Sequence, residues 1–186
     1  MPLRILLADD QQMIREALAM ILDLEIDLEV VKQVGRGDEV LPAVRETRPD
    51  VALLDIEMPG ATGIEAAAEL ARSGLTSQAG APVRSLILTT FRRPGYLRRA
   101  LEAGASGFVV KDGTASQLAQ AVRRTAAGLR VVDSVLAEEA KWQGSSPLTG
   151  RETEVLRAAE TAGSVKEIAD CLRERYATTS RRPWRR

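Results

Sequence analysis

The sequence predicts an α/β fold with five parallel strands in one doubly wound sheet of order 2-1-3-4-5, followed by a small all-α segment. Short apolar runs alternate with segments of helical periodicity over residues 1–127, which is typical of βαβ units. Two of the runs are apolar at almost every position, as in strands that helices cover on both faces. An arrangement with one antiparallel edge strand is the open alternative.

Each predicted strand is an apolar run bounded by polar or turn-forming residues. The runs are 3–8, 28–34, 51–54, 84–88 and 107–110. The first predicted helix carries an apolar stripe at i, i+3, i+4, i+7 and i+8, formed by Ile14, Ala17, Leu18, Ile21 and Leu22. Further helices are predicted over 38–47, 63–72, 94–103 and 114–127. Thr114 and Gln117 have the spacing of a capping box at the start of the last one.

The rest of the chain has a different pattern. Residues 128–146 contain several Gly and Ser residues and only a short helical stretch, so we interpret them as a linker. Two capping-box patterns, at Thr149 and Ser164, predict helices over 150–162 and 165–172. Apolar periodicity stops after Leu172. Residues 173–186 hold six Arg and one Glu, and we expect a disordered tail there.

The composition excludes several classes of site. The 26 basic and 26 acidic side chains give a formal net charge of zero, and 45% apolar residues suffice for a core. The lack of histidine excludes Ser-His-Asp and Cys-His nucleophiles, His-containing zinc sites and a phosphohistidine carrier. The single cysteine, Cys171, excludes an internal disulfide framework. Because no membrane-spanning run or signal-peptide pattern is visible, we expect a cytoplasmic protein.

Acidic residues follow two of the predicted strands. Asp9 and Asp10 come directly after the first strand, and Asp55 comes directly after the third. In a 2-1-3-4-5 sheet these strands are neighbours, and the crevice at their carboxyl ends is where such folds bind ligands. Three neighbouring carboxylates repel one another unless a cation neutralises them, and oxygen ligands suit Mg²⁺ or Mn²⁺. We therefore expect a metal at this edge.

The fourth and fifth strands add two polar groups at the same edge. Thr89 ends the fourth apolar run and Lys111 ends the fifth. A hydroxyl and an ammonium beside a metal-bound aspartate make a phosphoryl-transfer site, in which Asp55 is the nucleophile and the other groups neutralise the phosphoryl oxygens. Each such residue alone is more often a turn former or a surface group. Polar residues at four strand ends of one edge favour a single site.

These motifs resemble the receiver domain of two-component response regulators. They are Asp9-Asp10 after an apolar run, and the segments 54–60, 88–91 and 107–112, within about the first two-thirds of the chain. The resemblance implies that Asp55 accepts phosphate from a sensor histidine kinase, or slowly from small phosphodonors. It also implies metal coordination by Asp10 and Asp55, by Asp9 through water, and by the Glu57 main-chain carbonyl.

The resemblance further implies a switch. Phosphate draws the Thr89 hydroxyl inward, an aromatic ring at the Phe108 position follows, and the surface of the fourth helix changes. A simple core role is the alternative for Phe108, which lacks a tyrosine hydroxyl. Slow hydrolysis of its own aspartyl phosphate is the only enzymatic activity expected. Haloacid-dehalogenase-type phosphatases carry a second Asp two residues after the nucleophile, where this chain has Glu57.

Segments 147–156 and 166–172 resemble the start of a LuxR-type helix-turn-helix domain. With the receiver, the chain is identified as a member of the NarL/FixJ class, most like regulators associated with lipid desaturation control in actinobacteria. Cys171 falls on the inward face of its helix and is expected to be a core residue. The family continues with a recognition helix for the major groove and a dimerising helix. Neither is recognisable here, so we predict an incomplete domain.

Two origins of residues 173–186 stay open. Back-translation from Arg173, read from the third base of its codon, can encode Gly-Thr-Val-Arg-Asn-Tyr-Leu-Ser-Ser, the beginning of the family's recognition helix. An out-of-frame deletion near Leu172 would account for this match. A genuine Arg-rich tail, with weak and salt-sensitive contacts to phosphates, is the alternative.

Two functions follow as hypotheses. In the first, the chain is a response regulator that is phosphorylated on Asp55 and controls transcription by binding promoter DNA, as a homodimer when phosphorylated. In the second, it is a receiver without DNA-binding output that acts as a phosphate sink or as an inhibitory dimer partner. Sequence-specific DNA binding separates the two hypotheses.

Overall fold

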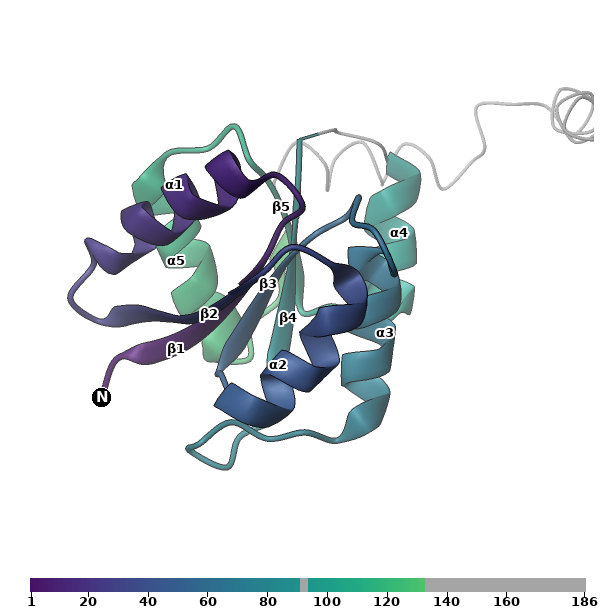
Figure 1. The fold of residues 1–186 in the computed structure, drawn as a ribbon, viewed down its shortest axis with the longest axis horizontal. Coiled ribbons are helices and arrows are strands. Elements are labelled where there is room, and N and C mark those ends of the chain that lie inside the picture. The colour runs from purple at the N-terminus through teal and green to yellow at the C-terminus, as the bar shows by residue number, and fades with distance from the viewer. Residues whose placement is uncertain (91–93, 133–186) are drawn as a thin grey trace, which may run out of the picture. The chain divides into compact units, whose positions relative to one another are not determined.

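A parallel six-stranded sheet of order β2-β1-β3-β4-β5-β6 forms the centre of the computed structural model, which describes residues 1–90 and 94–132. Helices α1 and α5 lie on one side of the sheet, and α2, α3 and α4 lie on the other (Figure 1). The strands are β1 (Leu3–Ala8), β2 (Leu28–Val34), β3 (Val51–Asp55), β4 (Arg84–Thr89), β5 (Gly107–Val110) and β6 (Val131–Val132).

Two of the helices, α3 and α5, begin with a capping box. They are α1 (Gln12–Asp23), α2 (Val40–Thr47), α3 (Gly63–Ser73), α4 (Pro94–Glu102) and α5 (Ala115–Ala126), with a 3₁₀ turn, η1 (Gly37–Glu39), before α2. Thr114 and Gln117 form the predicted capping box of α5. Thr62 and Glu65 form another at α3, and Gly74, with a φ of 65°, caps the C-terminus of α3. These caps satisfy main-chain groups that a helix end leaves without partners.

The predicted fold class and strand order are confirmed, with one addition. β6 pairs in parallel with Gly107 and Phe108 of β5, so the sheet has six strands and not five. Its residues, Val131 and Val132, were expected in the linker. They extend the sheet because the outer edge of β5 is otherwise unpaired and Val131 packs into the core. Every strand pair of the described sheet is parallel, so the antiparallel alternative is wrong.

Several boundaries differ from the predicted ones. Asp55 and Thr89 are the last residues of β3 and β4 and do not follow them, because their main chains still pair with the neighbouring strands. The helix expected from Asp38 begins as a 3₁₀ turn. In α1, Ala17 is exposed, while Ala19 and Leu22 are the buried residues. The inward face of α1 is thus rotated slightly from the predicted stripe.

The core consists of two layers, one on each face of the sheet. Leu6 and Leu54 belong to the layer beneath α2, α3 and α4, whereas Leu7 and Leu53 belong to the layer beneath α1 and α5. Successive residues of a strand point to opposite faces. This two-sided burial explains why β1 and β3 are almost continuously apolar.

The remaining predictions concern residues outside the described part of the chain. They are the linker beyond Val132, the helices over 150–162 and 165–172, the core role of Cys171, and the tail 173–186. Among residues 1–90 and 94–132, no helix has both the length and the apolar character needed to cross a membrane.

Candidate phosphoacceptor site

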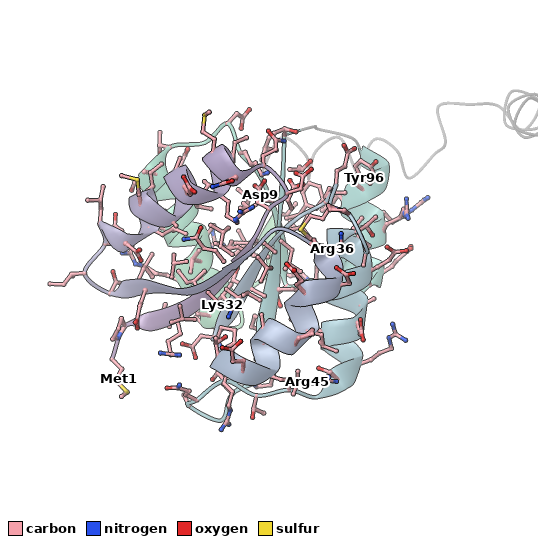
Figure 2. The ribbon with its side chains drawn as sticks, in the orientation of Figure 1. Met1, Asp9, Lys32, Arg36, Arg45 and Tyr96 are labelled. Atoms are coloured by element: carbon pink, nitrogen blue, oxygen red, sulfur yellow. The ribbon has the colours of Figure 1, made fainter. Side chains whose placement is uncertain are left out.

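The carboxyl ends of β1, β3, β4 and β5 carry polar side chains at one edge of the sheet. Figure 2 labels Asp9, which follows β1 at this edge. Asp55 ends β3 beside Leu88 of β4, and Thr89 ends β4 beside Val110 of β5. The Lys111 main-chain N–H donates a hydrogen bond to the Thr89 carbonyl at 2.8 Å. Parallel pairing therefore brings together groups that come from four separate parts of the chain.

Lys111 bridges two of the predicted carboxylates. Its Nζ lies 2.6 Å from Oδ2 of Asp9 and 2.6 Å from Oδ1 of Asp55. The side chains of all three residues are nearly buried, with exposed fractions of 7% for Lys111, 1% for Asp9 and 10% for Asp55. A buried ammonium needs charged partners of this kind. The sequence predicted that these three groups share a site, and the geometry adds that they form one hydrogen-bonded ion cluster.

Local main-chain geometry orients both carboxylates. Oδ1 of Asp9 accepts a hydrogen bond from the Gln11 main-chain N–H at 3.0 Å. Oδ2 of Asp55 accepts one from the Glu57 main-chain N–H at 2.9 Å. Each Asp therefore bonds to the N–H two residues on, an arrangement that short acidic side chains favour at turns. Every carboxylate oxygen of Asp9 and Asp55 has a donor.

The loop after Asp55 is held tightly by two glycines. The Gly37 N–H donates to the Pro59 carbonyl at 3.0 Å, and a Cβ at Gly37 would lie 1.8 Å from the main-chain oxygen of Ala61. A Cβ at Gly63 would lie 1.9 Å from the main-chain oxygen of Asp55. Only glycine allows these close main-chain contacts. The position of the loop after β3 therefore depends on the 3₁₀ turn after β2.

Burial and the ion cluster shift two pKa values. Burial raises the pKa of Asp55, and the negative charge of Asp9 raises it further. The hydrogen bond and the positive charge of Lys111 lower this pKa, but the net shift is upward. Burial lowers the pKa of Lys111, but hydrogen bonds to Asp55 and Asp9 outweigh it, and its net shift is also upward. Lys111 therefore keeps its proton, and the cluster keeps a positive charge beside Asp55 at neutral pH.

A small cavity of about 70 Å³ opens at this edge. It is lined by Asp10, Gln11, Asp55, Ile56, Glu57, Thr89 and Thr90. Asp10 is exposed, whereas Asp55 and Thr89 are buried residues that line the cavity. Asp9 is not among the lining residues. The cavity thus brings together three acidic residues, Asp10, Asp55 and Glu57, and two threonines.

The side chains that line the cavity do not by themselves make a complete site for a hard cation. Within the described residues, no three Asp, Glu, His or Cys side chains come together in a way that could hold a metal ion. The chemistry of Asp10, Asp55 and the Glu57 carbonyl is nevertheless that of an oxygen-ligand site. Mg²⁺ characteristically uses one or two carboxylates and retains several waters. These residues fit Mg²⁺ better than a metal that needs a complete protein cage.

A protein-family comparison matches residues 5–123 to the response regulator receiver domain, which is more than half of the chain. The chain belongs to the response regulator family. The match runs from within β1 through β5 to most of α5. It therefore includes every residue of the candidate site.

The relatives of this receiver are regulators of transcription. The chain is 42% identical over 168 residues to the transcriptional regulatory protein DesR of Bacillus subtilis, covering 90% of the chain and 80% of DesR. It is 35% identical over 176 residues to the DNA-binding transcriptional activator DevR/DosR of Mycobacterium tuberculosis, covering 90% and 78%. A LuxR-family response regulator from Aurantimonas sp. SI85-9A1 has a solved structure with a TM-score of 0.69 and 30% identity, covering 77% and 99%.

The two predicted switch residues of the receiver lie on one face of neighbouring strands. Phe108 is opposite Ile87, two residues before Thr89, so Phe108 and Thr89 face the same layer of the core. Phe108 is fully buried in the layer beneath α4, together with Leu97 and Ala100. Thr89 reaches the cavity and Phe108 does not. This geometry agrees with both interpretations of Phe108, as a switch and as a core residue.

The structure adds three residues to the receiver site that sequence reasoning missed. Gln11 and Thr90 line the cavity, and Arg15 donates a hydrogen bond to the Asp9 main-chain carbonyl. Gln11 and Thr90 directly follow predicted site residues, and this adjacency could have indicated them. Arg15 also had a signal, because it precedes Leu18 and Ala19 by three and four residues and so shares their helix face.

Proposed function

We propose that Asp55 accepts a phosphoryl group from the phosphohistidine of a sensor histidine kinase, and that this modification controls transcription. The observation that carries the proposal is that Asp55, which pairs with Lys111, lines a cavity together with Asp10 and Thr89. A nucleophilic carboxylate must be accessible to the phosphodonor, and it needs nearby positive charge that stabilises the incoming phosphoryl oxygens. The membership in the response regulator family supports the same role.

The transfer is a direct displacement at phosphorus. A carboxylate oxygen of Asp55 forms the new bond as the bond between phosphorus and the imidazole nitrogen breaks. The imidazole nitrogen keeps the electron pair of the broken bond, and the product is an aspartyl phosphate. Lys111 remains close enough to bind a phosphoryl oxygen, and the Thr89 hydroxyl can donate to another. A small phosphodonor would react slowly by the same displacement.

The proposal includes Mg²⁺, or Mn²⁺, in the cavity. Asp10, Asp55 and the Glu57 main-chain carbonyl would hold it, and Asp9 would act through water. When bound, such an ion neutralises charge on the phosphoryl group. Asp9 also keeps Lys111 in place, because it shares the ammonium with Asp55.

The output is proposed from the relatives. We infer that phosphorylation moves Thr89 and Phe108, changes the surface of α4 and favours a homodimer that binds promoter DNA in the cytoplasm. Slow hydrolysis of the aspartyl phosphate by water returns the receiver to its initial state, and no other enzymatic activity is proposed. DevR/DosR is named as a DNA-binding activator, which supports this output.

A receiver without DNA-binding output is the second candidate, because the apolar periodicity of the sequence stops after Leu172. Gel-shift titration with promoter DNA, before and after phosphorylation, separates the two candidates. Saturable and sequence-specific binding supports the regulator, and weak binding that disappears with salt supports the phosphate sink or inhibitory partner. Sequencing of the encoding DNA past residue 172 tests the frame-shift hypothesis separately.

The phosphoacceptor is tested by intact mass after incubation with Mg²⁺ and a small phosphodonor. One phosphate should be added to the chain, and Asp55→Asn should abolish the adduct. Asp50→Asn is a matched control, because Asp50 precedes the same strand and its side chain accepts a hydrogen bond from the Arg4 main chain. An adduct that persists in Asp55→Asn and disappears in another carboxylate variant would contradict the assignment.

A further inference from the structure

Arg15 is a charged residue on the inward face of α1. It precedes Leu18, Ala19 and Leu22 by three, four and seven residues, and the last two are buried against the sheet. Arg15 itself is half-buried. A guanidinium in such a place needs hydrogen-bond acceptors, since its desolvation is otherwise costly. The acceptor of its hydrogen bond, the main-chain carbonyl of Asp9, lies at the phosphoacceptor site.

The guanidinium of Arg15 holds the end of β1. Its Nη1 donates a hydrogen bond to the main-chain carbonyl of Asp9 at 2.5 Å. It also lies beside the loop after β2, because a Cβ at Gly35 would be 3.4 Å from the same nitrogen. Arg15 therefore connects α1 with the turn that carries both Asp9 and Asp10.

The carbonyl that Arg15 holds belongs to the peptide unit between Asp9 and Asp10. This unit is planar, so its carbonyl direction also sets the N–H direction and the position of the Asp10 Cα. The Asp9 N–H donates to the Val34 carbonyl at 3.1 Å, and the Asp9 carboxylate is held by Lys111 and Gln11. Asp10, by contrast, is exposed at the cavity. Its orientation depends on the peptide unit from which it projects.

We propose that Arg15 is a positioning residue for the Asp10 carboxylate, and that it acts by fixing the Asp9–Asp10 peptide unit. The inference rests on the proposed function, because Asp10 is a proposed Mg²⁺ ligand there. Residues that orient a metal ligand typically contribute about 10- to 100-fold to metal affinity. Loss of the Arg15 hydrogen bond should therefore weaken Mg²⁺ binding.

Electrostatics alone predicts the opposite sign. Arg15 is a cation near the cavity, and a cation repels Mg²⁺. Removing its charge without any change in the geometry would strengthen Mg²⁺ binding. Weaker binding after removal of Arg15 therefore reports lost positioning, and the direction of the change distinguishes the two effects.

The test is a titration of the full chain with Mg²⁺. The amide NMR signals of residues 9–11 and 55–57 serve as the readout of binding. We expect Arg15→Met to weaken Mg²⁺ binding about tenfold. Arg45→Met is the matched control, because Arg45 is an exposed arginine on α2, away from Asp9 (Figure 2). It should change the affinity less than about twofold. Unchanged or tighter Mg²⁺ binding by Arg15→Met overturns the proposal.

A double-mutant cycle identifies the residue through which Arg15 acts. Asp10→Asn should weaken Mg²⁺ binding by itself, and adding Arg15→Met should then have little further effect. A further tenfold loss in the Asp10→Asn background would overturn positioning through Asp10. If Asp10→Asn leaves Mg²⁺ affinity unchanged, the metal site of the proposed function fails, which is a distinct result.

Thermal denaturation without Mg²⁺ shows whether each variant is folded. If Arg15→Met does not fold, Arg15→Lys carries the same test, because lysine keeps the positive charge but lacks the planar guanidinium and has a different reach. We expect about threefold weaker Mg²⁺ binding in Arg15→Lys. Binding as tight as in the unsubstituted chain would overturn the proposal.

Discussion

Lys111 Nζ lies 2.6 Å from Oδ2 of Asp9, although 102 residues separate the two in the chain. The same nitrogen lies 2.6 Å from Asp55, so one ammonium pairs with two buried carboxylates. This shared ion pair joins the first and fifth strands at the edge where the phosphoacceptor stands. It has consequences for stability as well as for chemistry.

Lys111→Met should destabilise the fold. The substitution leaves Asp9 and Asp55 buried without their cation, and removing one partner of a buried ion pair typically costs about 3–5 kcal/mol. Urea denaturation without Mg²⁺ measures the free energy of unfolding. The control is Lys32→Met on β2 (Figure 2), where the pair with Glu46 is largely exposed and should contribute less than about 1 kcal/mol. Equal losses in both variants would contradict a buried ion cluster.

Asp55→Asn should raise the melting temperature at pH 7 in the absence of Mg²⁺. Burial raises the pKa of Asp55 above its ordinary value of 3.8, so the folded state favours the protonated carboxyl. The stabilisation by protonation is complete below the unfolded-state pKa and is lost as the pH rises through the folded-state pKa. The uncharged amide avoids this loss, and a gain of about 1 kcal/mol would raise the melting temperature by about 2–4 °C.

A pH series of melting curves checks this sign. The difference between Asp55→Asn and the unsubstituted chain should shrink as the pH falls below about 4, where the carboxyl is protonated in both states. Asp10→Asn is a suitable control, because Asp10 is exposed and should have a smaller effect. A melting temperature of Asp55→Asn that is lower than that of the unsubstituted chain at pH 7 would refute the prediction.

Gly37→Ala should destabilise the loop after Asp55. A Cβ at Gly37 would lie 1.8 Å from the Ala61 main-chain oxygen, so one of the two loops must move. Steric insertions of this kind cost about 1–3 kcal/mol. Gly95→Ala in α4 is the control, because a Cβ there would meet nothing within 4 Å and alanine is the better helix former. Urea denaturation should show opposite signs for the two variants, and a neutral Gly37→Ala would count against the tight loop contact.

Arg123→Gln should make the melting temperature depend less strongly on pH in the acidic range. Nε and Nη2 of Arg123 lie 2.7 and 2.6 Å from the Asp27 carboxylate, and this hydrogen bonding lowers the pKa of Asp27. The resulting stabilisation is present above the unfolded-state pKa and is lost as the pH falls through the folded-state pKa. Melting curves from pH 2 to 7 should therefore converge at low pH. Arg124→Gln, at the neighbouring exposed position, should leave the profile unchanged.

The polar strand ends illustrate what could be predicted, and the number of strands illustrates what could not. Asp9, Thr89 and Lys111 each stand at the carboxyl end of an apolar run, and the rule that parallel strands share an edge was sufficient to bring them together. β6 was missed because two adjacent valines are too few to show a period. The start of α2 was misplaced because the chain first forms a 3₁₀ turn around Gly37.

The pairing of charges could not be predicted in the same way. The positions of Asp9, Asp55 and Lys111 indicated a common site, but they left open which oxygens the ammonium contacts. Arg15 was not identified from the sequence as a residue of the site. These contacts depend on distances between elements far apart in the chain, and core packing on both faces of the sheet sets those distances.

The amino-acid order alone was enough for the α/β class, the 2-1-3-4-5 order and the phosphoacceptor candidate Asp55, because apolar periodicity and strand-end chemistry are local properties. Tertiary packing decided that Lys111 pairs with both Asp9 and Asp55. It also decided that Arg15 donates a hydrogen bond to the Asp9 carbonyl and that β6 pairs with the edge of β5. Each of these contacts joins residues whose separation follows from how helices and strands stack, and no local pattern encodes that separation.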